Sequence, residues 1–156
     1  MTEAETSTIS RMRCSEIMTK NVRTATPDMS VGDVGALMRD GDMGAVPVVD
    51  EGKLIGIVTD RDIVVRVVAE GKDAATPVGE AMTTELFTVA ADDFVFEAIR
   101  LMGDKQIRRI PVVGAGGELV GIIAIADVAL ETEDEREIAE TLEEISSGAA
   151  FWGKGK

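Results

Sequence analysis

The hydrophobic positions of the chain first take a helical spacing between residues 31 and 39. Four apolar residues recur there and predict one buried helix face: Val31, Val34, Leu37 and Met38. Ser30 precedes them as a good N-cap, and Gly41 and Gly44 follow as stop signals. We therefore expect a helix over residues 31–39.

The period then shortens, and two β-rich runs surround a polar turn. Residues 46–49 and 54–58 flank Asp50-Glu51-Gly52-Lys53, a pattern typical of a β-hairpin. A short alternating run at 22–24 predicts a strand ahead of the first helix. A second helix is expected over about residues 60–69, with an apolar stripe formed by Ile63, Val64, Val67 and Val68.

The whole pattern occurs twice. Residues 17–49 recur 64 positions later at 81–113. After one extra residue within 115–117 the offset becomes 65, which places Asp62 on Asp127. A duplication of this length predicts that each copy folds as the same β-α-β-β-α unit.

The second copy predicts the same elements in the same order. Its short strand is expected at 87–89, and Asp92 or Asp93 is expected to cap the helix that follows. The remaining elements are two hairpin strands and a final helix, expected at 110–113, at 119–123 and from Asp127 onward.

These elements divide the chain into four parts: a leader, two repeats and a tail, with bounds at 1–13, 14–72, 78–130 and 131–156. The leader is rich in Thr, Ser and Glu, so we expect disorder. The tail predicts an acidic helix with an apolar face, followed by a mobile end. That helix would pack on the repeats or on a second copy; alternatively, it would dock another protein.

Charge and residue usage exclude several classes of function. The net charge of −13 disfavours nucleic acid and anionic membranes as partners, because both attract positive proteins. The chain has no His, which removes the commonest general base and metal ligand. Its single cysteine, Cys14, allows neither an internal disulfide nor a Cys-rich zinc site. We expect Cys14 to act as a small apolar residue; a redox bridge between two molecules is the alternative.

The chain shows no signal for membrane insertion or export. Its longest apolar run, residues 119–126, is far too short to span a bilayer. The first ten residues are polar and acidic, unlike a signal peptide. We therefore expect a cytoplasmic protein.

Two short motifs occur in both copies. VPVV at 46–49 corresponds to IPVV at 110–113, and GIVTDRD at 56–62 corresponds to GIIAIAD at 121–127. The glycine that opens each of the longer motifs would permit close backbone approach within a strand.

With these motifs in order, the chain resembles the CBS domain, and its two copies resemble a CBS pair, or Bateman module. The resemblance covers about residues 14–130 and is to small stand-alone bacterial proteins of the hypoxic-response or general signal-transduction type. It implies an α+β fold in which two repeats pack about a pseudo-twofold axis and leave two clefts. It also implies adenine-nucleotide ligands (AMP, ADP, ATP, NAD or S-adenosylmethionine) and a disc-like homodimer.

The first cleft would form where GIVTDRD passes from strand to helix. The Thr59 hydroxyl can donate to a phosphate oxygen, and the Asp62 carboxylate can accept both hydroxyls of a ribose. Backbone N–H groups at a helix start also favour anions. The resemblance gives Thr59 and Asp62 these binding roles; the alternative is that they only cap the helix.

The resemblance implies that each cleft also draws on the other repeat. For the Asp62 cleft this adds six residues: Met82, Thr83, Thr84, Ile107, Arg108 and Arg109. An arginine there could hold a phosphate by a bidentate contact, although neighbouring strand residues point to opposite faces. The alternative is that Arg108 and Arg109 are a solvated pair near a helix end.

The second cleft is poorer in polar groups. Asp127 is present for a ribose, but Ala124 replaces the hydroxyl found at Thr59. The other expected contacts are Met18, Thr19, Lys20, Gly44 and Ala45. We therefore expect unequal clefts, with a charged nucleotide favoured at Asp62.

The sequence thus favours a non-catalytic sensor that relays nucleotide binding to an unidentified downstream protein. A ligand-free dimerisation or scaffold module with degenerate clefts is the alternative. An enzyme is disfavoured, because the sequence offers no nucleophile–base pair and no metal cluster, and we expect no catalytic cofactor.

Overall fold

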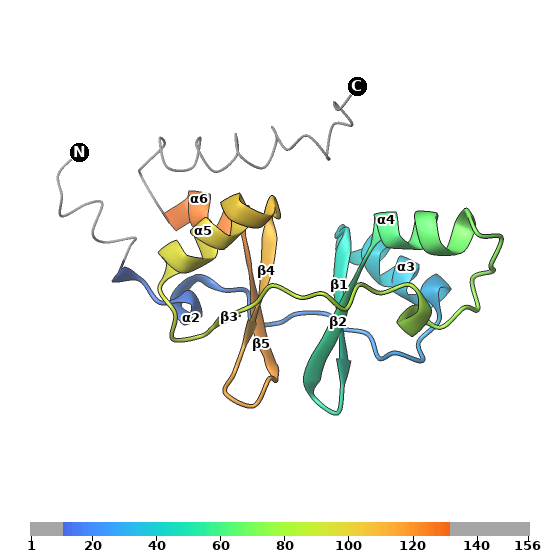
Figure 1. The fold of residues 1–156 in the computed structure, drawn as a ribbon, viewed down its shortest axis with the longest axis horizontal. Coiled ribbons are helices and arrows are strands. Elements are labelled where there is room, and N and C mark those ends of the chain that lie inside the picture. The colour runs from blue at the N-terminus through green and yellow to red at the C-terminus, as the bar shows by residue number, and fades with distance from the viewer. Residues whose placement is uncertain (1–10, 132–156) are drawn as a thin grey trace, which may run out of the picture. The chain divides into compact units, whose positions relative to one another are not determined.

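The computed structural model of the protein describes residues 11–131 (Figure 1). The expected acidic helix and mobile end of the tail lie outside these residues, as does most of the expected leader. Within them the protein forms both helices and strands, in agreement with the α+β expectation.

The chain forms two compact units whose boundaries differ from those of the sequence repeats. One unit combines residues up to Lys20 with 87–115 and the chain from Val120 onward, and we call it unit 1. The other, unit 2, combines 21–86 with 116–119. The segment that precedes the short strand of each repeat therefore belongs to the unit that holds the other repeat's hairpin.

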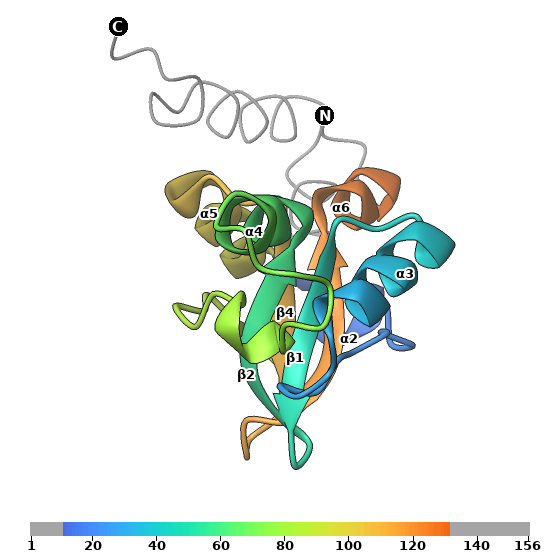
Figure 2. The same ribbon diagram turned by 90° about the vertical axis from the view of Figure 1, so that its right-hand side faces the viewer.

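Unit 2 is built on an antiparallel hairpin of β1 (Ala45–Asp50) and β2 (Lys53–Thr59). The turn residues Glu51 and Gly52 have φ values of 50° and 81°, as a tight two-residue hairpin turn requires. The hairpin confirms the sequence prediction, and its turn points away from α3 and α4 (Figure 2).

The prediction of a strand at residues 22–24 is wrong. The pairing is a single parallel bridge one residue later, where Ala25 lies beside Val48. The Ala25 N–H donates to Pro47 O at 3.0 Å, and Val49 N–H donates to Ala25 O at 2.8 Å. The pairing stops there because the chain turns at once, with Met29 N–H bonded to Thr26 O.

The first helix of unit 2, α3, spans Val31–Gly41. The Ser30 hydroxyl caps it by accepting a hydrogen bond from Asp33 N–H at 3.1 Å, as expected. The expected glycine stop is wrong: Gly41 is the last helical residue, and Asp42 takes the left-handed conformation at φ 50°. Aspartate tolerates this conformation better than most residues do.

The second helix of unit 2 begins as α4 (Asp60–Ile63) and continues as a π-helix, η1 (Val64–Val68). Only Val67 of the expected stripe is buried in η1, while Val64 and Val68 are 56% and 64% exposed. The predicted buried stripe is therefore wrong at these two valines. A π-turn holds one residue more than an α-turn, so the α-helical spacing from which the stripe was predicted does not apply within η1.

The core of unit 2 contains side chains from α3, β1, β2 and η1, from Ala25 and from the segment after η1. The short 3₁₀ helix η2 (Val78–Glu80) lies in that segment. The buried residues are Ala25, Val31, Val34, Met38, Val46, Val48, Val58, Val67, Val78 and Ala81.

Unit 1 is built on a sheet of three strands in the order β3-β4-β5. The strands are β3 (Val89–Ala90), β4 (Arg109–Val113) and β5 (Leu119–Ala124), and β3 runs parallel to β4. The hairpin strands confirm the prediction. The short strand expected at 87–89 begins only at Val89.

Three helices accompany this sheet: α2 (Cys14–Ile17), α5 (Val95–Lys105) and α6 (Ile125–Glu131). The expected Asp cap of α5 is wrong. Phe94 occupies the N-cap without a side-chain bond, and Asp93 Oδ2 instead accepts from Ala90 N–H at 2.8 Å. Helix α6 begins two residues earlier than expected.

Cys14 lies in the core of unit 1 and is fully buried. Its thiol lies 3.7 Å from Phe94 O. Burial, with a smaller contribution from the nearby Asp93 carboxylate, raises the pKa of the thiol to about 11. The thiol is therefore protonated at neutral pH, which fits the expected role as a small apolar residue.

Candidate functional site

A polar cluster of unit 2 forms at the end of β2, where two side chains cap α4. The Thr59 hydroxyl accepts from Asp62 N–H at 3.0 Å, and Asp62 Oδ2 accepts from Thr59 N–H at 2.9 Å. This reciprocal pair is a capping box. Because Thr59 Oγ1 serves here as an acceptor, its own hydrogen is free to donate to a ligand.

Thr83 completes this cluster from a distant part of the chain. It forms an antiparallel bridge with Ile57, with Thr83 N–H to Ile57 O at 2.8 Å and Ile57 N–H to Thr83 O at 3.0 Å. Its hydroxyl then lies 3.4 Å from both Asp62 carboxylate oxygens, a long hydrogen bond. The half-buried carboxylate therefore keeps acceptor capacity for further donors.

The approach of this segment requires Gly56. A Cβ at that position would lie 2.7 Å from Met82 Sδ and 3.0 Å from Thr83 O. In unit 1 the same packing recurs at Gly121, where a Cβ would lie 2.6 Å from Met18 Sδ and 2.9 Å from Thr19 O. The expectation that these strand glycines permit close approach is confirmed.

The corresponding cluster of unit 1 has the same backbone but fewer polar side chains. Thr19 forms an antiparallel bridge with Ile122, and Asp127 Oδ2 accepts from Ala124 N–H at 2.8 Å. Ala124 has no hydroxyl to return that bond. Among residues 11–131, Asp127 has no bond comparable to the one between Thr83 and Asp62.

The other expected contact residues are divided between the units. Arg108 and Arg109 are exposed members of unit 1, and Arg108 O accepts from Ile125 N–H at 2.9 Å. Ile107 and Lys20 also belong to unit 1, and Thr84 is an exposed residue of unit 2.

Gly44 and Ala45 belong to unit 2. Gly44 O accepts from Asp60 N–H at 3.0 Å, and Ala45 pairs with Thr59. Gly44 and Ala45 were expected beside Asp127 of unit 1, and the two arginines of unit 1 beside Asp62 of unit 2. Both expectations involve residues of different units and stay predictions.

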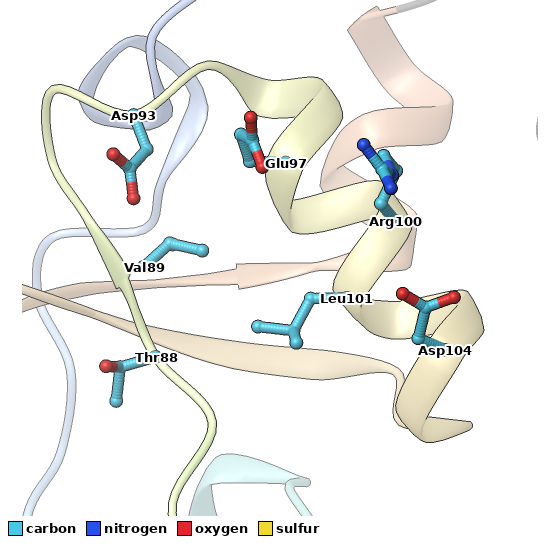
Figure 3. A pocket seen from close by; sticks show the side chains of 7 residues that line it. All are labelled: Thr88, Val89, Asp93, Glu97, Arg100, Leu101 and Asp104. Carbon is cyan, nitrogen blue, oxygen red and sulfur yellow. The ribbon is translucent and has the colours of Figure 1, made fainter.

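Sequence reasoning missed a hollow in unit 1, between β3 and the exposed face of α5 (Figure 3). Its volume is about 280 Å³, and it is lined by Thr88, Val89, Asp93, Glu97, Arg100, Leu101 and Asp104. The helical spacing of these charged residues indicates a polar face but gives no sign of concavity. Within residues 11–131, no group of three or more His, Cys, Asp or Glu side chains is arranged to hold a metal ion.

Among the described helices, none combines the length and the apolar content that a membrane span requires. Comparison with known proteins is more informative. The family model of the CBS domain matches the chain twice, at residues 14–69 and 78–134.

Two curated relatives cover most of the chain. The CBS domain-containing protein YhcV of Bacillus subtilis is 39% identical over 131 residues, which is 84% of this chain and 93% of the relative. Hypoxic response protein 1 of Mycobacterium tuberculosis is 34% identical over 116 residues, or 73% of this chain and 80% of the relative.

Three solved structures have similar folds. Hypoxic Response Protein I, with two coordinated zinc ions, gives a TM-score of 0.70 at 33% identity, covering 76% of this chain and 98% of the other. CBSX2 in complex with AMP gives a TM-score of 0.69 at 29% identity, covering 76% of this chain and 94% of the other. The CBS pair of MJ0100, in complex with 5′-methylthioadenosine and S-adenosylmethionine, gives a TM-score of 0.68 at 27% identity, covering 77% of this chain and 94% of the other.

Proposed function

Because this chain belongs to the CBS-domain family and carries the domain twice, we propose that it is a non-catalytic regulatory module that binds an adenine nucleotide. The ligand site is the cluster of Thr59, Asp62 and Thr83 in unit 2. The observation that carries the proposal is the Asp62 carboxylate, which is fixed by Thr59 N–H and still has free lone pairs.

The chemistry of this cluster suits a nucleoside better than a bare anion. A ribose presents two neighbouring O–H donors, and an ionised carboxylate accepts both. The free hydrogen of the Thr59 hydroxyl can then donate to a 5′-phosphate oxygen. AMP, 5′-methylthioadenosine and S-adenosylmethionine, which are bound in the similar structures, share the adenosine group. We therefore infer adenosine recognition, with AMP, ADP, ATP, NAD and S-adenosylmethionine as the candidate ligands.

We also infer that the protein acts as a homodimer through the exposed face of η1. Val64, Val65 and Val68 are 56%, 49% and 64% exposed, which is unusual for three large apolar residues within one helix. A second copy of this face would cover them. A downstream protein would read the ligand-dependent state of the dimer, and the expected cytoplasmic location is part of the same proposal.

One observation favours the alternative of a ligand-free scaffold. The side chains of Thr59 and Asp62 each accept a hydrogen bond from the other residue's backbone N–H, so the cluster needs no ligand to be stable. A thermal-shift panel of the five candidate ligands separates the two functions. At about 100 times Kd, a ligand should stabilise the protein by about 2.7 kcal/mol. A shift with at least one of them supports the sensor, and no shift at millimolar concentration supports the scaffold.

A further inference from the structure

Arg66, in the middle of the π-helix η1, holds the backbone of a segment far along the chain. Its Nη1 donates to Ala81 O at 3.1 Å and to Met82 O at 2.9 Å. All three residues belong to unit 2. These carbonyls immediately precede Thr83, whose hydroxyl faces Asp62.

The segment that Arg66 contacts is also held by packing against the core of unit 2 and by backbone hydrogen bonds on either side. On its N-terminal side, the Ala81 and Met82 N–H groups both donate to the carbonyl oxygen of Val78, the first residue of η2. After it, Thr83 pairs with Ile57. The guanidinium adds a side-chain contact to this segment, because a single nitrogen donates to the carbonyls of both Ala81 and Met82.

The choice of arginine has a physical reason. A guanidinium is a cation that carries several N–H donors in a fixed plane. Two carbonyl oxygens present partial negative charge to it. A lysine ammonium is a single mobile point of charge and would hold the same two oxygens with less geometric definition.

The second copy has no equivalent of this arginine. With the offset of 65 that relates Asp62 to Asp127, Arg66 corresponds to Glu131. An ionised carboxylate has no hydrogen to donate to a carbonyl. The first copy therefore has a hydrogen-bond donor at Arg66 that the second lacks, just as it has a hydroxyl at Thr59 where the second has Ala124. Both differences favour the Asp62 cluster of unit 2 as the ligand site.

We propose that Arg66 is a positioning residue of the Asp62 site: it fixes the carbonyls of Ala81 and Met82 so that Thr83 presents its hydroxyl to the Asp62 carboxylate and to the ligand. This proposal rests on the proposed function for its ligand, but the backbone contact stands independently of it. Arg66 is not a member of the ligand-contacting set.

Arg66→Met tests the proposal, with Arg23→Met as the matched control. Arg23 is an exposed arginine of unit 2 outside the proposed site, and within residues 11–131 its side chain makes no hydrogen bond. We expect about tenfold weaker AMP binding for Arg66→Met, because the stabilisation of the Thr83 segment by this charged hydrogen bond would be lost and the ligand would have to order the segment as it binds. Amide hydrogen exchange at Thr83 should become about tenfold faster. The control should stay within about twofold of the wild type on both measurements, and Arg66→Lys should lie between them.

The two readouts keep the proposals separable. Unchanged exchange at Thr83 in Arg66→Met would overturn the positioning role, whatever the nucleotide result. Faster exchange with unchanged AMP affinity would show that Arg66 supports the backbone without positioning the site, which also overturns it. If the wild type binds none of the five ligands, the proposed function fails, while exchange at Thr83 still decides whether Arg66 fixes the segment.

Discussion

Thr83 of the second sequence repeat is paired with Ile57 of the first, through two backbone hydrogen bonds of 2.8 and 3.0 Å. The pairing brings the Thr83 hydroxyl to the Asp62 carboxylate. A polar cluster at the end of one repeat's hairpin is thus completed by a residue that the sequence assigns to the other repeat. Duplication and exchange of this segment together give the protein a polar cluster that neither repeat contains by itself.

The close contact between Gly56 and Met82 makes Gly56→Ala a sharp test of this arrangement. The new Cβ would lie 2.7 Å from Met82 Sδ, so the segment must shift. We expect a loss of about 1–3 kcal/mol in the free energy of unfolding, as for other overpacked positions. Urea denaturation measures it.

Gly35→Ala is the matched control for this substitution. Gly35 lies inside α3, and a Cβ there would have no contact within 4 Å. The same chemical change should therefore stabilise the protein by about 0.5–1 kcal/mol, because alanine favours a helix. A loss at Gly35 as large as that at Gly56 would contradict the packing account.

The exposed valines of η1 predict the oligomeric state. The double substitution Val64→Lys and Val68→Lys places two charges on the proposed dimer face and should convert the dimer into a monomer. Sedimentation equilibrium measures the change. Ala115→Lys, at an exposed turn of unit 1, adds a charge elsewhere and should leave the dimer intact. A wild-type monomer, or a double variant that remains dimeric, would reject this face as the interface.

Cys14 predicts a pH dependence of stability in the alkaline range. Its pKa is about 11 in the folded protein against 9.0 as the ordinary value, so between these values the unfolded chain has lost a proton that the folded chain keeps. The thiol's contribution to stability is therefore complete below about pH 9 and decreases as the pH rises toward 11. Urea unfolding of wild type and Cys14→Ala between pH 8 and about 10.5 should show a steeper decline in the wild type. Parallel declines would contradict the burial argument.

Local signals explain which elements the sequence predicted well. The α3 helix has its cap at Ser30 and its apolar spacing in one short segment, and the β1–β2 hairpin has its turn at Glu51-Gly52. The bridge at Ala25 was misplaced because a parallel pairing depends on a distant strand, and no local pattern fixes its register. Val64 and Val68 lie in a π-helix, which the α-helical spacing of the apolar residues does not reveal.

The candidate site was predicted less evenly. Thr59 and Asp62 lie three residues apart, so their pairing follows from local helix capping. The place of Thr83 came only from the family resemblance. Arg66 left no signal, because its partners are backbone carbonyls and those carry no residue identity.

The central claim is that the two aspartates, although both accept a backbone bond at the start of a helix, differ as ligand sites. Calorimetric titration of AMP into wild type, Asp62→Ala and Asp127→Ala tests it most directly. Each substitution removes a comparable backbone contact, so each controls for the other's effect on stability. We expect Asp62→Ala to weaken AMP binding by at least about tenfold, equivalent to 1.4 kcal/mol, and Asp127→Ala to change it by less than about twofold. Equal losses in the two variants, or no heat of binding in the wild type, would contradict the account.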